Sequence, residues 1–430
     1  MTNIEQQSRQ GGRRETYLMG MLIVLGLVFF HSAQIFSGAE FYVVNTQQSG
    51  VAALAANLLL GFANMWGMPL MMFVAGSAIW FSLRKRTLGQ FLLNRVQRLV
   101  IPFITGIVLI FPPQVWIGIK FHLPSYDADY WQFLRQFFEI RFSLRAFPAF
   151  IVGAPANTFW STGYLWFLNY LFVYTLLLLP LLGYLRQESG QQLVSRLVSF
   201  LARPWVIFLL ALPIGLIEAF LMTDRTGQWN RFVWPFFIFY GFLLACDRRL
   251  GWVIQGHRRS ALLLGIVAFL GYFIGTGYLI AFLEVDPLTN YGPVGLLTRF
   301  FKGLGSWFWI IAIMGFARQI SQRRARQDPI SAVQSDNPGS TSPEAPGRPS
   351  WRDKLADYGR EAQLPFYVLH QLPIIMIAYF VVQWQVNALV KYILIVLGAI
   401  AATLLIYDIA VRRTPPTRFL FGLKPRITEQ

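Results

Sequence analysis

The chain has 430 residues, of which 55% are hydrophobic and 16% aromatic, and it carries a formal net charge of +17. Only 13% of its residues are charged, about half the usual share in soluble domains, and its mean hydropathy is +0.48. This composition excludes an ordinary soluble globular domain and indicates an integral membrane protein.

Apolar runs of about 20 residues recur along the chain, and each is long enough to cross a hydrocarbon core of about 30 Å. Only helices and closed barrels satisfy backbone polar groups in lipid, and the runs lack the period-two alternation of barrel strands. The sequence therefore predicts an all-α, polytopic transmembrane helical bundle of about ten spans. The expected spans are residues 17–37, 62–83, 99–117, 164–185, 205–222, 232–246, 261–283, 295–317, 364–384 and 391–411.

Positive charge is concentrated in alternate connecting segments. Most of the 37 Lys and Arg residues lie before the first expected span or after an even-numbered one, which places both termini in the cytoplasm (N-in/C-in). The same distribution argues against nucleic acid as a partner, because the positive residues lie at membrane boundaries and not on one compact basic domain.

The chain is expected to divide into three parts. Residues 1–317 form a membrane body with about eight spans, residues 318–360 a cytoplasmic and partly disordered linker, and residues 361–430 a two-span hairpin with a basic tail. The Pro/Ser/Gly-rich stretch 328–350 cannot bury a core. The first apolar run shows no convincing cleavage site and is interpreted as a retained span. The single cysteine, Cys246, excludes an intrachain disulfide.

The first apolar run, Leu22–Phe36, contains His31. An imidazole in hydrocarbon costs free energy unless it faces a polar cavity or a partner, so an intramembrane histidine is a functional-site candidate. Imidazole is also the side chain that most often performs general acid–base chemistry. A histidine that is hydrogen-bonded between helices for packing is the alternative interpretation.

Six short segments occur in chain order within this ten-span frame: Phe29–Phe36, Met68–Ser77, Arg95–Phe103, Pro112–Val115, Tyr164–Tyr174 and Phe366–Gln371. No one of them is specific. Together they resemble the bacterial acyltransferase-3 family of integral-membrane acyltransferases, and the resemblance covers nearly the whole chain apart from the linker.

This resemblance implies transfer of an acyl group, usually acetyl or succinyl, from cytoplasmic acyl-coenzyme A. The implied acceptor is a hydroxyl of a glycan or lipid-linked sugar at the outer side of a bacterial inner membrane. His31 corresponds to the expected catalytic base of the family, whose neutral imidazole takes the proton of the attacking hydroxyl. Membrane lipid and the sugar acceptor are the implied partners.

The sequence departs from the family pattern at several positions. Relatives usually have an arginine eleven residues before the histidine and often an acidic residue three positions earlier, where this chain has Gly20 and Tyr17. They tend to have an arginine in place of Gly67 and often a histidine in place of Tyr164. An alternative therefore stays open, namely a non-catalytic membrane subunit or degenerate acyltransferase scaffold with membrane-protein partners. A transporter is disfavoured, because no inverted repeat is found.

Arg95 and Arg98 are three residues apart and therefore lie on one helix face, just before Pro102. They are candidates to contact the phosphates of coenzyme A. Positive-inside anchoring at the end of a span is the alternative interpretation.

A second histidine, His370, lies about six residues into the expected ninth span, whereas His31 lies about fourteen residues into the first. From these depths the two imidazoles are expected not to touch. His370 is therefore expected to be a packing group or a group on the donor side.

Further ionisable residues lie inside the expected spans. Glu218 needs a partner there, for which Arg225 is a candidate, and a hydrogen bond made in protonated form is the alternative. Arg299 and Lys302 are candidates to hold an acidic acceptor sugar, or they extend to the interface as long side chains near helix ends do. No HExxH pattern, CxxC pair or carboxylate cluster occurs at metal-ligand spacing, so no bound metal is expected.

Overall fold

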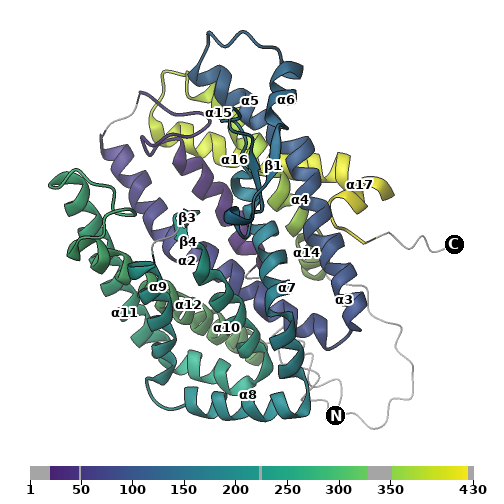
Figure 1. The fold of residues 1–430 in the computed structure, drawn as a ribbon, viewed down its shortest axis with the longest axis vertical. Helices are drawn as coiled ribbons and strands as arrows, with labels where there is room; N and C mark the ends of the chain where they lie inside the picture. Colours follow the sequence, from purple (N-terminus) through teal and green to yellow (C-terminus); the bar gives the residue numbers. More distant parts are fainter. Residues whose placement is uncertain (1–19, 48–49, 222–224, 328–350, 425–430) are drawn as a thin grey trace.

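The computed structural model describes residues 20–47, 50–221, 225–327 and 351–424, and helices form almost all of the regular structure in these ranges (Figure 1). Among them, six helices are long and apolar enough to cross a membrane: Gly50–Leu83, Leu88–His122, Gly163–Arg186, Arg248–Ala281, Pro293–Arg323 and Ala388–Val411. Two bent pairs pass the same test, Glu188–Leu201 with Val206–Phe220 and Asp357–Leu369 with Gln371–Val381. Shorter apolar helices cover Gly20–Gln34 and Arg231–Cys246. Every expected span falls on one of these helices. The all-α, polytopic class is thus confirmed, while the number of spans and their orientation stay predictions.

The elements have the following bounds in chain order. After the helix Gly20–Gln34 come α2 (Gly50–Leu83), α3 (Leu88–Arg95), the π-helical segment η1 (Val96–Val100), α4 (Ile101–Thr105), the π-helical segment η2 (Gly106–Ile110), α5 (Phe111–His122), α6 (Tyr130–Phe137), β1 (Ile140–Phe142), η3 (Leu144–Ala146), β2 (Ile151–Gly153), η4 (Gly163–Leu165), α7 (Trp166–Arg186), α8 (Glu188–Leu201), η5 (Val206–Leu210) and α9 (Ala211–Phe220). They continue with β3 (Arg225–Thr226), β4 (Trp229–Asn230), η6 (Arg231–Val233), α10 (Trp234–Cys246), α11 (Arg248–Ala281), α12 (Pro293–Gln327), α14 (Trp351–Leu369), α15 (Gln371–Val381), α16 (Ala388–Ile406), η7 (Tyr407–Val411) and α17 (Pro415–Leu420). The strands pair only as two antiparallel hairpins, β1 with β2 and β3 with β4.

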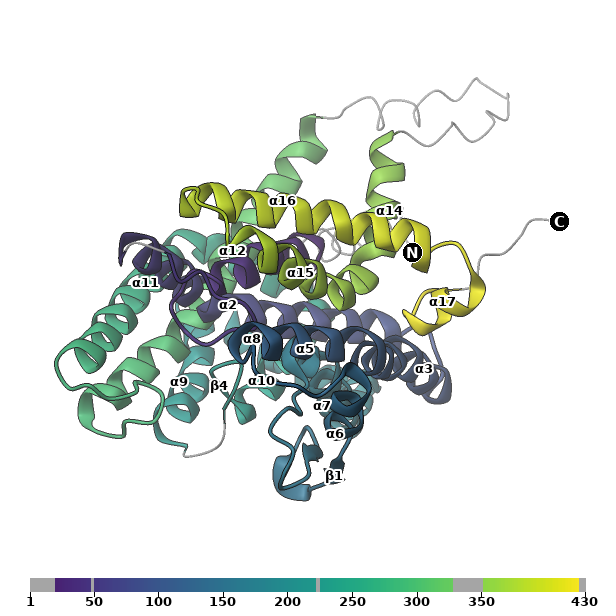
Figure 2. The same ribbon diagram turned by 90° about the horizontal axis from the view of Figure 1, so that it is seen from above.

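Helices from distant parts of the sequence lie side by side. Among the C-terminal helices, α15 contacts α5 and α14 contacts α4, while α16 packs against α15 on the side away from α5 (Figures 1 and 2). Elsewhere, α12 contacts α2, α9 and α11, and α10 contacts α2. The Tyr392 hydroxyl of α16 donates a hydrogen bond of 3.2 Å to the carbonyl oxygen of Phe29, which joins α16 to the first described helix. The C-terminal helices therefore complete the body that the N-terminal helices begin.

The helix Leu88–His122 is wound irregularly, because π-helical segments occur on both sides of Pro102. Proline lacks an N–H group and cannot continue the regular helical hydrogen bonding, and π turns are frequent at functional sites. A Cβ added at Gly106 would lie 2.7 Å from the Leu165 side chain and 3.2 Å from that of Val368. This irregular helix thus passes very close to the start of α7 and the end of α14.

The expected linker is helical at both ends. α12 runs to Gln327 and α14 begins at Trp351, so helices extend into the range 318–360 from either side. Residues 328–350 lie outside the described residues, and the disorder expected for them stays a prediction. The early start of α14 changes the position of His370, as shown below.

The helices α2 and α10 meet at two glycines. A Cβ added at Gly76 would lie 2.0 Å from the carbonyl oxygen of Ile238, and one added at Gly241 would lie 1.8 Å from that of Phe73. The Ser77 hydroxyl also donates a hydrogen bond of 2.8 Å to the carbonyl oxygen of Gly241. Because lipid supplies no hydrophobic force between helices, such close backbone packing is a main source of their association.

We expect Gly241→Ala to separate α2 from α10 and to lower the free energy of unfolding by about 1–3 kcal/mol, the usual cost of overpacking. Gly183→Ala in α7 is the matched control, because its added Cβ meets nothing within 4 Å. Thermal unfolding of both purified variants in detergent measures the difference. Equal unfolding temperatures for the two variants would contradict the expectation.

Candidate active site

His31 lies three residues before the end of the helix Gly20–Gln34 and is 9% exposed. Its Nδ1 atom is 2.7 Å from Oε1 of Gln34, which follows on the same helix face. An amide oxygen only accepts hydrogen bonds, so Nδ1 carries the proton and the Nε2 atom of the neutral ring keeps a lone pair. This tautomer suits a group that takes a proton from a hydroxyl.

His370 lies at the junction of α14 and α15, where the helix axis bends by 56°. Pro373 explains the bend, because it lacks the N–H that would otherwise bond to the carbonyl of Leu369 one turn earlier. The ring is fully buried, and its Nδ1 atom is 2.7 Å from the carbonyl oxygen of Tyr367. Nδ1 therefore donates, and Nε2 is an acceptor that has no hydrogen-bond partner within the described parts of the chain.

The two imidazoles lie together, with ring centroids 5.3 Å apart. The expectation that they do not touch was wrong. It took the ninth span to begin near residue 364, but α14 begins at Trp351, so His370 lies nineteen residues, or roughly 28 Å at 1.5 Å per residue, along the helix from its start. The histidines nearest the two ends of the chain thus form one buried site.

Tyr164 completes the group of rings. Its ring centroid lies 6.1 Å from that of His31 and 5.0 Å from that of His370. The Tyr164 hydroxyl donates a hydrogen bond to the carbonyl oxygen of Val368, and the Tyr367 hydroxyl donates one to the carbonyl oxygen of Tyr164. These reciprocal bonds join the start of α7 to the last turn of α14.

Glycine is required just before this tyrosine. Gly163 has a φ of +45°, and a Cβ added there would lie 2.1 Å from the ring of Phe111. Only glycine combines a positive φ with so close a neighbour at little cost. The turn at Gly163 therefore directs Tyr164 toward the histidines.

Several buried polar atoms near the two histidines in sequence or space have no hydrogen-bond partner among the described residues. They are Ser32 Oγ next to His31, Gln371 Oε1 next to His370, and Gln114 Oε1. The Gln114 side chain lies close to Tyr164 and donates through Nε2 to the carbonyl oxygen of Ile110 at 3.1 Å. Leaving such a group unsatisfied costs about 1–3 kcal/mol, so these atoms are candidates to contact a polar ligand.

Sequence reasoning did not single out Gln34, Gln114 or Gln371 as functional residues. Each of them belongs to one of the short segments that carried the family resemblance. The signal that could have found them was the uncharged amide side chain in an otherwise apolar span.

Arg95 and Arg98 lie nearer the start of the irregular helix. Arg95 is the last residue of α3, and Arg98 lies within η1. Arg98 is exposed, whereas Arg95 is half-buried with its guanidinium 4.9 Å from the ring centroid of Phe91. Gly106, which touches the site through Leu165 and Val368, is eleven residues from Arg95, or roughly 16 Å at 1.5 Å per residue. One helix thus connects the arginines with the two-histidine site.

Glu218 lies in a second polar group, where it pairs with Arg225. Of the two interpretations of the sequence, an ion pair with Arg225 or a hydrogen bond in protonated form, the structure shows the first. Its Oε2 atom is 2.7 Å from Nη1 of Arg225 and 3.9 Å from Nζ of Lys302. Its Oε1 atom accepts a hydrogen bond of 2.6 Å from the backbone N–H of Asn230. No hydrogen bond or ion pair given by the described residues joins this group to His31, Tyr164 or His370.

Arg299 and Lys302 do not extend to the interface, since each is 1% exposed. Nε and Nη2 of Arg299 donate to the carbonyl oxygens of Glu218 and Ala219, both at 3.1 Å, and Lys302 donates to that of Gln228. The interpretation that both side chains extend to the interface was wrong. Both cations are buried and donate to backbone carbonyls at the end of α9 and in the β3–β4 turn. A direct role of Arg299 in holding an acceptor stays a hypothesis.

We expect Glu218→Ala to lower the free energy of unfolding by about 3–5 kcal/mol, because it leaves Arg225 and Lys302 buried without their carboxylate. Glu188→Ala, at the exposed first residue of α8, is the control and is expected to change little. Chemical denaturation in detergent compares the two. An unfolding midpoint of Glu218→Ala that matches the control would contradict a structural role for this carboxylate.

A model of the acyltransferase-3 family, described as an acyltransferase domain, matches residues 21–409. The chain belongs to the acyltransferase-3 family. No curated protein and no solved structure matches it. The family and the apolar helices together make it a multi-pass membrane protein, with acyltransferase as its general class.

The departures from the acyltransferase-3 pattern have different surroundings. A Cβ added at Gly20 would lie 2.3 Å from Nε2 of Gln363, so the end of the Gln363 side chain occupies the place where a longer residue would start. A Cβ added at Gly67 would meet nothing within 4 Å. Tyr17 lies outside the described residues. The usual arginine at position 20 is thus replaced by a neutral amide from α14.

The acyltransferase-3 fold of this chain offers no cluster of three or more His, Cys, Asp or Glu side chains suited to a metal within the described ranges. His122 and His257 instead lie within hydrogen-bond distance of backbone carbonyls, those of Phe41 at 2.6 Å and Val253 at 2.9 Å. The chemistry available at the two-histidine site is therefore that of neutral imidazoles, amides and a tyrosine.

Proposed function

We propose that this protein transfers an acyl group from acyl-coenzyme A to a hydroxyl of a glycan or lipid-linked sugar. The donor enters from the cytoplasmic side of a bacterial inner membrane, and the acceptor hydroxyl is reached from the outer side. The observation that carries the proposal is the buried pair of imidazoles, each with Nδ1 bound to an oxygen acceptor and Nε2 left with a lone pair.

His31 acts as the general base in this reaction. Its Nε2 atom takes the proton of the acceptor hydroxyl while the hydroxyl oxygen attacks the thioester carbonyl. The new ester C–O bond forms, the C–S bond breaks, and the proton on His31 passes to the departing thiolate of coenzyme A. Atoms and charges therefore balance without a metal or a redox partner.

His370 supports this step, since the centroid of its ring lies 5.3 Å from that of His31. Its Nε2 lone pair accepts a hydrogen bond from the hydroxyl or from the protonated His31, and its own position is fixed by Tyr367 and the bend at the start of α15. Gln114 and Gln371 offer amide groups that hold the polar parts of donor or acceptor. A short-lived acyl-histidine on His31 is the other route by which the same residues achieve transfer.

Arg95 and Arg98 would hold the donor. A guanidinium binds phosphate oxygens through paired N–H groups, and coenzyme A carries several phosphates. The long arm between its phosphates and its thioester suits the stretch of helix between Arg95 and Gly106. No acidic residue occurs between residues 84 and 120, which leaves this segment positively charged.

We expect His31→Ala to lower the rate of acyl transfer by about 100-fold or more, the usual contribution of a general base, with near-normal expression and folding. His370→Ala is expected to reduce the rate to a smaller extent. His257→Ala on α11 is the control, because that imidazole lies away from the site. The measurement is loss of the acetyl-coenzyme A thioester with purified protein, and unchanged turnover by His31→Ala would overturn the mechanism.

For the donor site, we expect the double substitution Arg95→Gln/Arg98→Gln to raise the KM for acyl-coenzyme A about tenfold or more, while kcat changes less, since charge-assisted bonds to phosphate are lost. Arg84→Gln/Lys85→Gln removes the same charge from exposed positions of the same connecting segment. Steady-state kinetics compares the pairs. An equal rise in KM for both pairs would mean that Arg95 and Arg98 supply only diffuse positive charge.

A non-catalytic membrane subunit is the second candidate, and the place that Gln363 takes beside Gly20 favours it. The two functions differ in a direct measurement on purified protein. Binding of acetyl-coenzyme A with His31-dependent loss of the thioester supports the enzyme. Stable co-purification with other membrane proteins, without binding or turnover, supports the subunit.

A further inference from the structure

The helix α8 lies across the end of the molecule, at a large angle to its neighbour α7 (Figure 1). The chain bends by 113° between Glu188–Leu201 and the apolar segment Val206–Phe220. Gly190, Val194, Val198 and Leu201, spaced at helical intervals, form its buried face. This geometry fits a helix that lies along the membrane surface beside its spanning neighbours.

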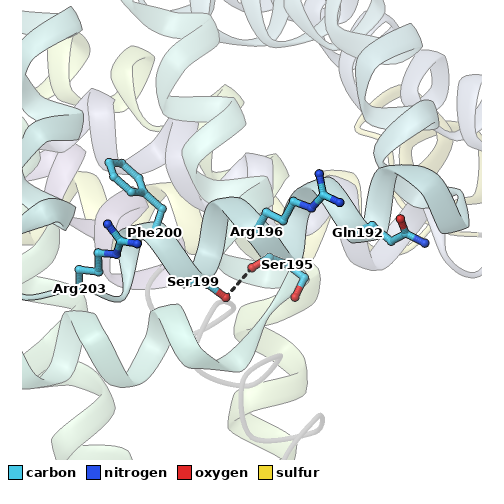
Figure 3. A pocket seen from close by; sticks show the side chains of 6 residues that line it. All are labelled: Gln192, Ser195, Arg196, Ser199, Phe200 and Arg203. Atoms are coloured by element: carbon cyan, nitrogen blue, oxygen red, sulfur yellow. Dashed lines mark hydrogen bonds between the residues drawn. The ribbon is translucent and has the colours of Figure 1, made fainter.

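The opposite side of α8 carries a polar face, which we call the Arg196 face. It consists of Gln192, Ser195, Arg196, Ser199, Phe200 and Arg203, all exposed, and these residues line a shallow hollow of about 540 Å³ (Figure 3). The spacing of three and four residues places the five members within α8 along one side of the helix, and Arg203 follows two residues after its end. Figure 3 shows the Arg203 guanidinium beside the ring of Phe200, while the Arg196 side chain extends toward Gln192.

A third guanidinium reaches this face from α11. Arg249 donates to Oγ of Ser199 at 3.0 Å and to Oγ of Ser195 at 3.1 Å, and it is paired with Asp247 at 2.9 Å. The Ser199 hydroxyl in turn donates to the carbonyl oxygen of Ser195 at 2.8 Å. The serines are thus held in place by one arginine, while Arg196 forms no hydrogen bond or ion pair with any described residue.

The surroundings of the Arg196 face are apolar. Leu193 is 48% exposed, Phe200 47% and Trp205 59%, and the Arg203 guanidinium lies 5.6 Å from the centroid of the Phe200 ring. Tryptophan and arginine together are typical of the boundary between hydrocarbon and headgroups. A ligand that fits both features has a phosphate for the arginines and acyl chains for the apolar side chains.

We propose that the Arg196 face binds the phosphate of an anionic phospholipid in the leaflet against which α8 lies. Planar guanidinium groups match phosphate oxygens, and positive residues at the surface of an anionic leaflet gain further from its negative potential. The phosphates of soluble coenzyme A share this chemistry, but they lack the chains that Leu193, Phe200 and Trp205 would contact.

The test uses the full-length protein in a neutral detergent and titrates it with short-chain phosphatidylglycerol or short-chain phosphatidylcholine. We expect the double substitution Arg196→Gln/Arg203→Gln to weaken phosphatidylglycerol binding about tenfold or more. The control is Arg135→Gln/Arg141→Gln, which removes the same charge from exposed residues in the α6–β1 region and is expected to leave binding within about twofold.

A second variant distinguishes loss of lipid binding from a folding defect. Arg196→Lys/Arg203→Lys keeps the charge but removes the planar forks, so it is expected to fold normally and to bind phosphatidylglycerol with intermediate affinity. Equal affinity of wild type and Arg196→Gln/Arg203→Gln would overturn the proposal, and so would equal binding of the two lipids by wild type. Displacement of phosphatidylglycerol by coenzyme A from wild type, but not from Arg196→Gln/Arg203→Gln, would instead make this face a donor-phosphate site.

Discussion

The reciprocal hydrogen bonds of Tyr164 and Tyr367 hold together the parts of the molecule on which its chemistry depends. Each hydroxyl donates to a backbone carbonyl on the other side of the contact, across 204 and 203 residues of sequence. Such bonds form in a place where water does not compete, and the Val368 carbonyl lies in the last turn of α14, where carbonyls lack intrahelical partners. They fix the end of α14 against the start of α7, and His370 follows directly from that end.

The rest of the site depends on how helices bend around this contact. Pro373 bends the chain at His370, Gly163 turns it at Tyr164, and the π-helical segments around Pro102 bring Gly106 against Leu165 and Val368. Each is a local departure from regular helix, and each lies within a few residues of a polar side chain. In a membrane, irregular backbone is tolerated where it is buried in protein or lines a cavity, which is the situation here.

Much of the fold could be predicted from the sequence, because hydropathy alone separates spans from connections. His31 could also be predicted as a functional residue, because an imidazole in a long apolar run costs free energy unless it has a polar partner. The position of His370 was not, because the first half of α14 carries Lys354, Asp357, Arg360 and Glu361, and a hydropathy scale begins the span only after them. The carbonyl partners of Arg299 and Lys302 were equally hidden, because their positions depend on the β3–β4 turn and the end of α9.

The hydroxyl of Tyr164 has a consequence for the movement of protons. Its hydrogen is committed to the carbonyl of Val368, so this phenol cannot pass a proton onward, and the amides near the site do not titrate. Of the described side chains grouped there, only the two imidazoles can store one. A proton released in this site therefore leaves with the product and not along the helices. Over one complete turnover, such a reaction would move no net charge through the protein.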